Sequence, residues 1–278
     1  MKAKVIPVTR VLEDSFVYSC TFERKYSNYE QFLPYHVLSF QFSGETFIQH
    51  QSGKLTLKKN QLLLTQKNQL AKSIKIPGTD KVYKSISIIL TDAAVRQYAA
   101  DNAICENKWY TGQKILLLNP GELLRGYFKS LLPYVTNSKK VSKKLVAIKI
   151  NEAIELLLDL KPTLKSFLFD FSEPYKIDLG KFMLQNYHYN VPIGHFAKLT
   201  GRSLPAFKRD FSQTFHTSPR KWLQGKRLTE AYHLIKQTKR KPTEIYLEVG
   251  FENLSHFYTS FKRKFGVTPG SIKRKKIF

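Results

Sequence analysis

The chain is poor in cysteine and has no long apolar run. Its 278 residues include only Cys20 and Cys105, without a CxxC pair; this excludes a disulfide scaffold and favours free thiols in a reducing compartment. No apolar stretch approaches the roughly 20 residues of a membrane-spanning helix. The N-terminal sequence MKAKVIPVTR lacks the apolar segment of a secretion signal. We therefore expect a cytoplasmic protein that does not associate with membranes.

The residue patterns of catalysis are also missing. A metal-binding cupin needs clustered histidine and carboxylate ligands, typically an HxH motif, whereas His36 and His50 stand apart and no HxH occurs in the sequence. There is no phosphate-cradling glycine loop, and no serine or cysteine lies in a nucleophile motif. We expect no metal, no cofactor and no enzymatic activity, which makes an enzymatic cupin the least favoured alternative.

Acidic residues are scarce, with 21 Asp and Glu against 46 Lys and Arg, for a formal net charge of +25. The excess is densest in residues 171–278, which hold 21 Lys and Arg against 7 Asp and Glu. Such a field attracts polyanions, most commonly nucleic acid. A solvated lysine-rich surface would explain the charge alone equally well, so the assignment needs a motif.

The sequence divides into a β-rich part and a helical part, and a chain of this length also suits two domains. Between residues 17 and 90, short β-rich runs alternate with turn residues such as Ser43-Gly44 and Pro77-Gly78. Several short strands at close spacing favour an antiparallel β-sandwich, such as a small cupin-like jelly roll. We assign residues 1–165 to this domain, with helices from about residue 91.

Helix signals begin after the last of these strands. Thr91-Asp92 caps a predicted helix through Ala99, and the sequence Asn119-Pro120-Gly121-Glu122 opens another that ends near Pro133. Ser138 is expected to cap a longer helix reaching about Leu160. Its wide apolar face favours docking on its own domain over use in a homodimer, which stays the alternative. That face comprises Val141, Leu145, Ile148, Ile150, Ile154, Leu157 and Leu158.

The segment 166–177 is the predicted interdomain linker, and residues 178–278 are predicted to be all-helical. This second part contains one pattern twice. The first copy runs Phe196-Ala197, Gly201, Phe207, Phe211, Phe215, Ser218-Pro219. The second runs Ile245-Tyr246, Gly250, Phe257, Phe261, Phe265, Thr268-Pro269. Each copy has the layout of a helix-turn-helix, predicted at about 193–215 and about 242–265.

In a helix-turn-helix the first helix needs a small residue where the second crosses it, and the turn needs a residue with positive φ. Ala197 and Gly201 meet both needs in the first copy. Ser203 follows as an N-cap, and Pro205 is tolerated in the first turn of the next helix. With the phenylalanines buried, the residues predicted to face DNA in this copy are Arg202, Ser203, Pro205, Lys208, Arg209, Ser212 and Gln213.

In the second copy Asn253 is the predicted N-cap. The residues predicted to face DNA there are Leu254, Ser255, His256, Tyr258, Thr259 and Lys262. Tyr246 stands where the first copy has Ala197, so either the helices cross further apart or the ring leans outward. Between the copies, Ser218-Pro219 begins a helix to about Gln237. At 1.5 Å per residue it is about 30 Å long, enough for both copies to reach major grooves about 34 Å apart.

These residues resemble the DNA-binding domain of the AraC/XylS family of transcriptional regulators over about 100 residues, from Asp178 to Lys276. The resemblance is carried by Gly250-Phe251, Phe257, Phe261-Lys262, Phe265-Gly266 and Thr268-Pro269, with Arg227-Leu228 and Ala231 in the connecting helix. It implies a promoter-binding regulator, usually an activator that contacts RNA polymerase, with a cupin-like N-terminal domain. It also implies base contacts from Pro205, Lys208, Arg209, Leu254, Ser255, Tyr258 and Thr259.

The nature of the regulatory signal stays open. The N-terminal domain could bind a small effector, a regulatory protein or a second copy of itself. The alternative function is a basic adaptor that binds nucleic acid without sequence preference, which salt dependence and sequence preference would separate from a specific regulator.

Overall fold

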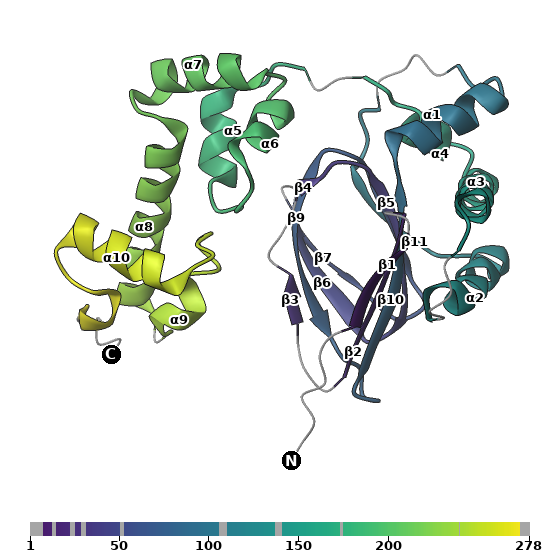
Figure 1. Cartoon of the computed structure of the whole chain (residues 1–278), viewed down its shortest axis with the longest axis horizontal. Helices are drawn as coiled ribbons and strands as arrows, with labels where there is room; N and C mark the ends of the chain where they lie inside the picture. Colours follow the sequence, from purple (N-terminus) through teal and green to yellow (C-terminus); the bar gives the residue numbers. More distant parts are fainter. Residues whose placement is uncertain are drawn as a thin grey trace. The chain divides into compact units, whose positions relative to one another are not determined.

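The computed structural model describes residues 8–12, 15–22, 26–28, 32–50, 53–105, 110–136, 141–172, 175–238 and 240–272. The chain forms two compact units, and the boundary between them falls after Ser172. The first unit is a β-sandwich with helices and the second is all-helical (Figure 1), in agreement with the predicted fold class.

The first unit contains two antiparallel sheets. One has the strand order β1-β2-β10-β5-β8-β11, and the other β3-β9-β6-β7. The strands are β1 Val8–Leu12, β2 Phe16–Phe22, β3 Tyr26–Asn28, β4 Phe32–Leu33, β5 His36–Ser43, β6 Glu45–His50, β7 Gly53–Leu57, β8 Leu62–Thr65, β9 Gln69–Ile76, β10 Val82–Leu90 and β11 Ile115–Leu118.

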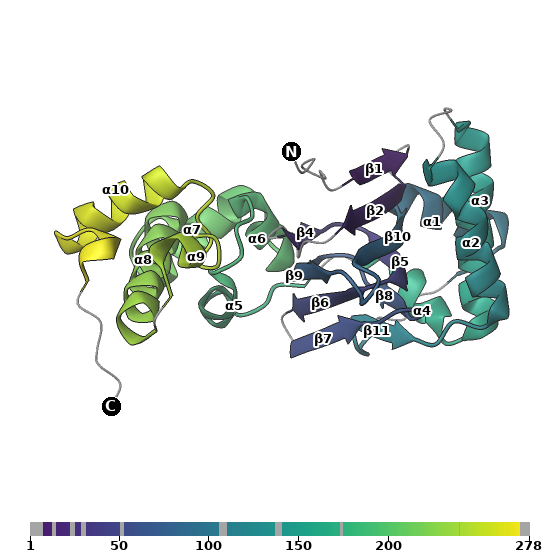
Figure 2. The same ribbon diagram turned by 90° about the horizontal axis from the view of Figure 1, so that it is seen from below.

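Helices cover one face of the larger sheet (Figure 2). The register sets Leu64, Leu38, Ile88 and Phe16 side by side across four strands, and all four are buried. Alternate residues of a strand point to opposite faces, so this row presents one apolar surface. The helices packed with it are α1 Asp92–Asp101, α2 Glu122–Thr136, α3 Lys143–Leu160 and α4 Leu164–Leu168.

Two helix boundaries differ from those predicted. α2 begins at Glu122 and continues through Pro133 to Thr136, because the residues beyond the proline still carry the buried face, including Val135 at 1% exposure. α3 begins at Lys143, where the Ser142 hydroxyl accepts from the amide of Leu145. Ser138, the predicted cap, lies outside the described residues. The α3 face is docked as expected, except that Ile148 is 52% exposed.

The predicted linker, 166–177, begins too early. α4 and the residue after it belong to the first unit, with Phe167, Leu168 and Phe169 fully buried in its core. Sequence periodicity missed them because a five-residue helix is too short to show a pattern. The Asp170 carboxylate fixes the next turn by accepting hydrogen bonds from the Tyr110 and Ser172 amides.

A histidine is buried beside this turn. His36 is 1% exposed, its Nδ1 accepts from the Lys67 amide at 3.3 Å, and its ring lies near Phe167. Burial, and then the charge of Lys67, lower the pKa of His36 to about 4, against opposing effects of Asp92 and Asp170. The imidazole is therefore neutral in the folded protein and has a structural place in the core.

We expect the first unit to lose about 3 kcal/mol of stability from His36 alone between pH 6.5 and pH 4. The unfolded state takes up a proton near pH 6.5, whereas the folded state takes it up only near pH 4, so the stabilisation is full above pH 6.5 and is lost as pH falls. Urea denaturation of wild type and His36→Gln at pH 7 and pH 4.5 measures it. Equal losses of unfolding free energy in wild type and His36→Gln would contradict the role given to His36. The control is His233→Gln, at an exposed position in the other unit.

The second unit holds two groups of helices joined by a long one (Figure 1). The first group comprises α5 Leu179–Asn186, α6 Ile193–Leu199 and α7 Leu204–Phe215. The long helix is α8 Pro219–Gln237. The second group comprises α9 Pro242–Ile245 and α10 Leu254–Phe265, followed by a short 3-10 turn at Pro269–Ser271.

Candidate nucleic-acid interface

The first helix-turn-helix unit, α6 and α7, turns at Gly201. Its φ is +63°, and a Cβ built there would lie 2.4 Å from the Tyr175 carbonyl carbon. Only glycine fits, because a side chain would meet backbone as well as an unfavourable dihedral. Ala197, at 1% exposure, lets the two helices cross closely. Both predictions made for this turn are confirmed.

The recognition helix α7 is capped as its sequence predicts. The Ser203 hydroxyl accepts from the Ala206 amide, and Pro205 lies in the first turn. Phe207 and Phe211 are fully buried. The side chains opposite them are exposed, namely those of Pro205, Lys208, Arg209, Ser212 and Gln213.

Arg202 differs from this exposed set. Its side chain is 8% exposed, and its guanidinium pairs with Asp210 at 3.0 Å. It also donates to the carbonyls of Ile177 and Thr200. Arg202 is therefore less open to DNA than predicted, because its Nε and Nη1 donors hold the turn; a contact with DNA stays a prediction.

The Asp210 carboxylate of α7 forms ion pairs with three cationic side chains. Arg202 first, and then Lys176 and Arg209, hold the pKa of its carboxyl down at about 2. Arg209 donates one bond to it at 3.2 Å, yet its side chain remains 67% exposed. A guanidinium has five N–H donors, so most of those on Arg209 stay available for a ligand.

The second helix-turn-helix, formed by α9 and α10, has the same arrangement with a shorter first helix. The Asn253 side chain accepts from the His256 amide, which confirms the predicted cap. Of the predicted DNA-facing residues on α10, Ser255, His256, Thr259 and Lys262 are exposed, while Leu254 and Tyr258 are half-buried against the core. Arg263 and Lys264, which are not among the predicted residues, are exposed as well.

Tyr246 is accommodated by the shortness of α9. The helix ends at Ile245, and Tyr246 forms its C-cap. The ring is half-buried, with its centroid 6.5 Å from that of Phe257. The ring therefore packs against the apolar core of the second helix group instead of pointing away from it. No small residue is needed at position 246.

Arg227 of α8 ties the two groups of helices together. Its guanidinium donates to the carbonyls of Tyr187 at 2.9 Å, Tyr189 at 2.7 Å and Gly250 at 2.9 Å. The first two acceptors follow α5 and the third lies in the second turn. Burial lowers the pKa of Arg227 to about 10, so it stays charged at neutral pH.

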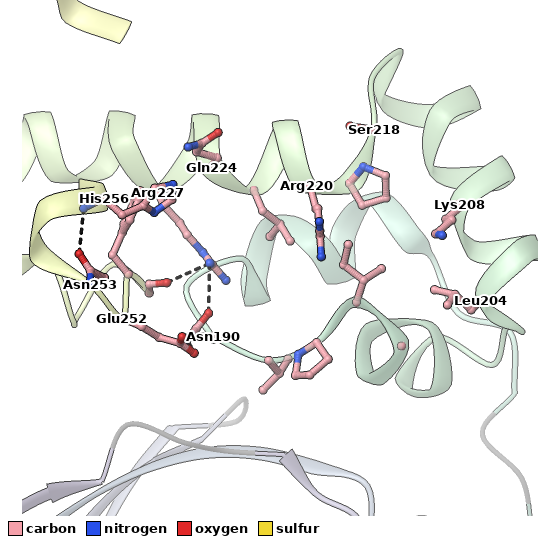
Figure 3. Close-up of a pocket in the computed structure, with 18 of the residues that line it drawn as sticks. Asn190, Leu204, Lys208, Ser218, Arg220, Gln224, Arg227, Glu252, Asn253 and His256 are labelled. Carbon is pink, nitrogen blue, oxygen red and sulfur yellow. Dashed lines mark hydrogen bonds between the residues drawn. The ribbon is translucent and has the colours of Figure 1, made fainter. Parts of the chain in front are cut away.

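A groove of about 1310 Å³ lies between α7, α8 and the start of α10 (Figure 3). Leu204, Lys208 and Ser212, spaced four residues apart, line it from α7. Arg220 and Gln224 line it from α8, and His256 from α10. Sequence reasoning missed Arg220 and Gln224, although their spacing of four already places them on one helix face.

Within the part of the chain that the structure describes, no group of three or more His, Cys, Asp or Glu side chains is arranged to hold a metal ion. Nor does any helix in those ranges combine the length and apolar character that a bilayer crossing requires.

Comparison with known proteins agrees with this geometry. Residues 196–275 match the protein-family model described as a helix-turn-helix domain, and residues 36–167 match that of the ExsA N-terminal regulatory domain. The chain is 26% identical over 245 residues to the thermoregulatory protein LcrF of Yersinia pestis, covering 86% of each chain. It is 25% identical over 235 residues to the HTH-type transcriptional regulator ExsA of Pseudomonas aeruginosa, covering 84% of each.

A shorter match, to the virulence regulon transcriptional activator VirF of Yersinia enterocolitica, is 35% identical over 99 residues and spans 36% of each chain. The matched regions cover nearly all of both helix-turn-helix units and most of the β-sandwich. The chain therefore belongs to the AraC/XylS family of DNA-binding transcriptional regulators.

Proposed function

We propose that this regulator binds promoter DNA by placing α7 and α10 in adjacent major grooves of one duplex. The observation that carries the proposal is that both recognition helices expose polar or basic rows while the first two phenylalanines of each are buried. On α7 the row centres on Lys208 and Arg209, and on α10 it centres on Ser255, Thr259 and Lys262. Pro205, Leu254 and Tyr258 would add apolar contacts, for example to a thymine methyl.

The length of α8 supports this arrangement. Its 19 residues span about 28 Å at 1.5 Å per residue. Successive major grooves on one side of B-DNA lie about 34 Å apart. Arg227 supports it as well, because its bonds to the loop after α5 and to the second turn restrain the two helix groups within the second unit.

We further propose that the protein activates transcription in the cytoplasm, without catalysis of its own. VirF carries the name of an activator, and the first unit matches a regulatory domain. A regulator of this type would contact RNA polymerase. Its signal would reach the first unit as a small effector, a regulatory protein or a second copy of the chain.

Salt titration on two duplexes tests the proposed function. The affinity of the full-length protein should fall steeply with salt on any duplex, while a preference for a sequence selected from a random pool persists. Equal competition by all duplexes at every salt concentration would instead indicate the basic adaptor that binds without sequence preference.

Arg209→Ala should weaken binding to the selected duplex by about 1–3 kcal/mol and relax base choice at one position, because its free guanidinium donors suit bidentate contact with guanine. Lys262→Ala should weaken selected and random duplexes alike, as expected for a phosphate contact. Fluorescence anisotropy on both duplexes measures each loss. If Arg209→Ala loses the same on both, Arg209 contacts phosphate and not a base.

A further inference from the structure

The groove between the two recognition helices shares Lys208 with the base contacts proposed above, but its residues on α8 have no part in those contacts. At about 1310 Å³ it exceeds the 300–1,000 Å³ typical of pockets for small ligands. It runs along α8, and the first residues of α6, α7 and α10 border it (Figure 3). Its size and position suit a segment of a macromolecule held between α7 and α10.

The charges of the groove identify the chemistry of that segment. Glu252 is its one carboxylate among the lining residues, and it accepts a hydrogen bond from Asn190 at 2.6 Å. Arg227, already bonded to backbone carbonyls, lies near enough to interact with the Glu252 charge. Lys208 and Arg220 therefore make the electrostatic potential in the groove positive, which favours an anionic occupant.

Arg220 is the cation best placed to bind it. The side chain is exposed and extends from α8 into the groove (Figure 3). Within the described ranges it forms no ion pair and no hydrogen bond with another side chain. It follows Pro219 at the start of α8, where the helix dipole adds positive potential. The Ser218 hydroxyl makes no capping bond there, so it can donate to an anion as well.

We propose that this groove receives the sugar–phosphate backbone running between the two major grooves, and that Arg220 is a positioning residue that contacts a phosphate there. The proposal rests on the proposed function, because a duplex bound by both α7 and α10 must cross the space between them. Its apolar residues, such as Leu204 and Ile193, would face sugar carbons. Contacts of this kind fix the register of the protein without reading sequence.

The test compares Arg220→Ala with Lys221→Ala in the full-length protein. Both substitutions remove one charge from α8, but Lys221 does not line the groove. At 0.15 M salt, Arg220→Ala should weaken binding about fivefold on selected and random duplexes alike, and lower the slope of log affinity against log salt by about 0.9, as one counterion is no longer released. Lys221→Ala should change affinity by less than about twofold. Thermal unfolding of each variant checks that the fold is intact.

A second measurement locates the contact on the DNA. Methylphosphonates placed at the phosphates midway between the two contacted major grooves should weaken wild type but cause no further loss in Arg220→Ala. Equal losses in Arg220→Ala and Lys221→Ala, or full additivity with the methylphosphonates, would overturn the proposal. If Arg220→Ala leaves affinity unchanged while Arg209→Ala relaxes base choice, Arg220 does not contact a phosphate in the groove, and the proposed function stands. Absence of any sequence preference in wild type would instead overturn the proposed function.

Discussion

Replacing Arg227 by alanine should lower the free energy of unfolding of the second unit by about 4 kcal/mol, since each buried acceptor left unsatisfied costs about 1–3 kcal/mol. The guanidinium now satisfies the carbonyls of Tyr187, Tyr189 and Gly250. Alanine reaches none of them. The loss should also free α10 to move relative to α7, so affinity for a duplex that needs both helices should fall more than affinity for random DNA.

Hydrogen–deuterium exchange of the full chain measures this effect locally. Faster exchange is expected in the loop after α5 and around Gly250, with the β-sandwich unchanged. Arg220→Ala is the matched control, because it removes an exposed arginine from the same helix and should change stability by less than about 0.5 kcal/mol. If the two variants exchange alike, Arg227 does not hold the helix groups together.

Gly201→Ala should destabilise the first helix-turn-helix unit by about 4 kcal/mol, the sum of the left-handed dihedral and overpacking. The new Cβ would lie 2.4 Å from the Tyr175 carbonyl carbon and 2.6 Å from the Lys176 amide nitrogen. Both atoms are backbone, so no side-chain rotation relieves the contact. The segment 175–176 must move, and it carries the Lys176 partner of Asp210.

Gly266→Ala separates the two causes. Gly266 also has a left-handed φ, +74°, but a Cβ there meets nothing within 4 Å. Its substitution should cost only the dihedral contribution, about 1–2 kcal/mol. Calorimetry of the full-length variants compares them. Equal losses at the two positions would mean that the close approach to Tyr175 has no energetic role.

Much of the second unit could be predicted from sequence because its signals are local. Repeated phenylalanines four residues apart define the buried faces of α7 and α10, and Ser203 and Asn253 cap the helices that they precede. Gly201 and Gly250 take positive φ because the turns require it. Each of these signals acts within about one or two helical turns, so the printed sequence contains it in full.

The structure of the first unit is harder to predict from sequence, because its signals are not local. Its β texture predicted a sandwich, but the pairing of β10 with both β2 and β5 depends on strands far apart in the chain. Pro133 favoured a helix end, yet burial of Val135 keeps α2 intact beyond it. The end of α4, from residue 166, was taken for linker because its burial comes from contacts with the sandwich core.

The sequence by itself determined the two-part architecture, the duplicated helix-turn-helix and the family. Only the tertiary structure decided what each arginine does. Arg202 and Arg227 bond to carbonyls up to 40 residues away, whereas Arg209 and Arg220 reach into solvent. The side chain is the same in all four cases, and its position in the sequence does not reveal which distant backbone lies beside it. That depends on how the loops close, because a guanidinium binds whichever acceptors the fold brings within reach.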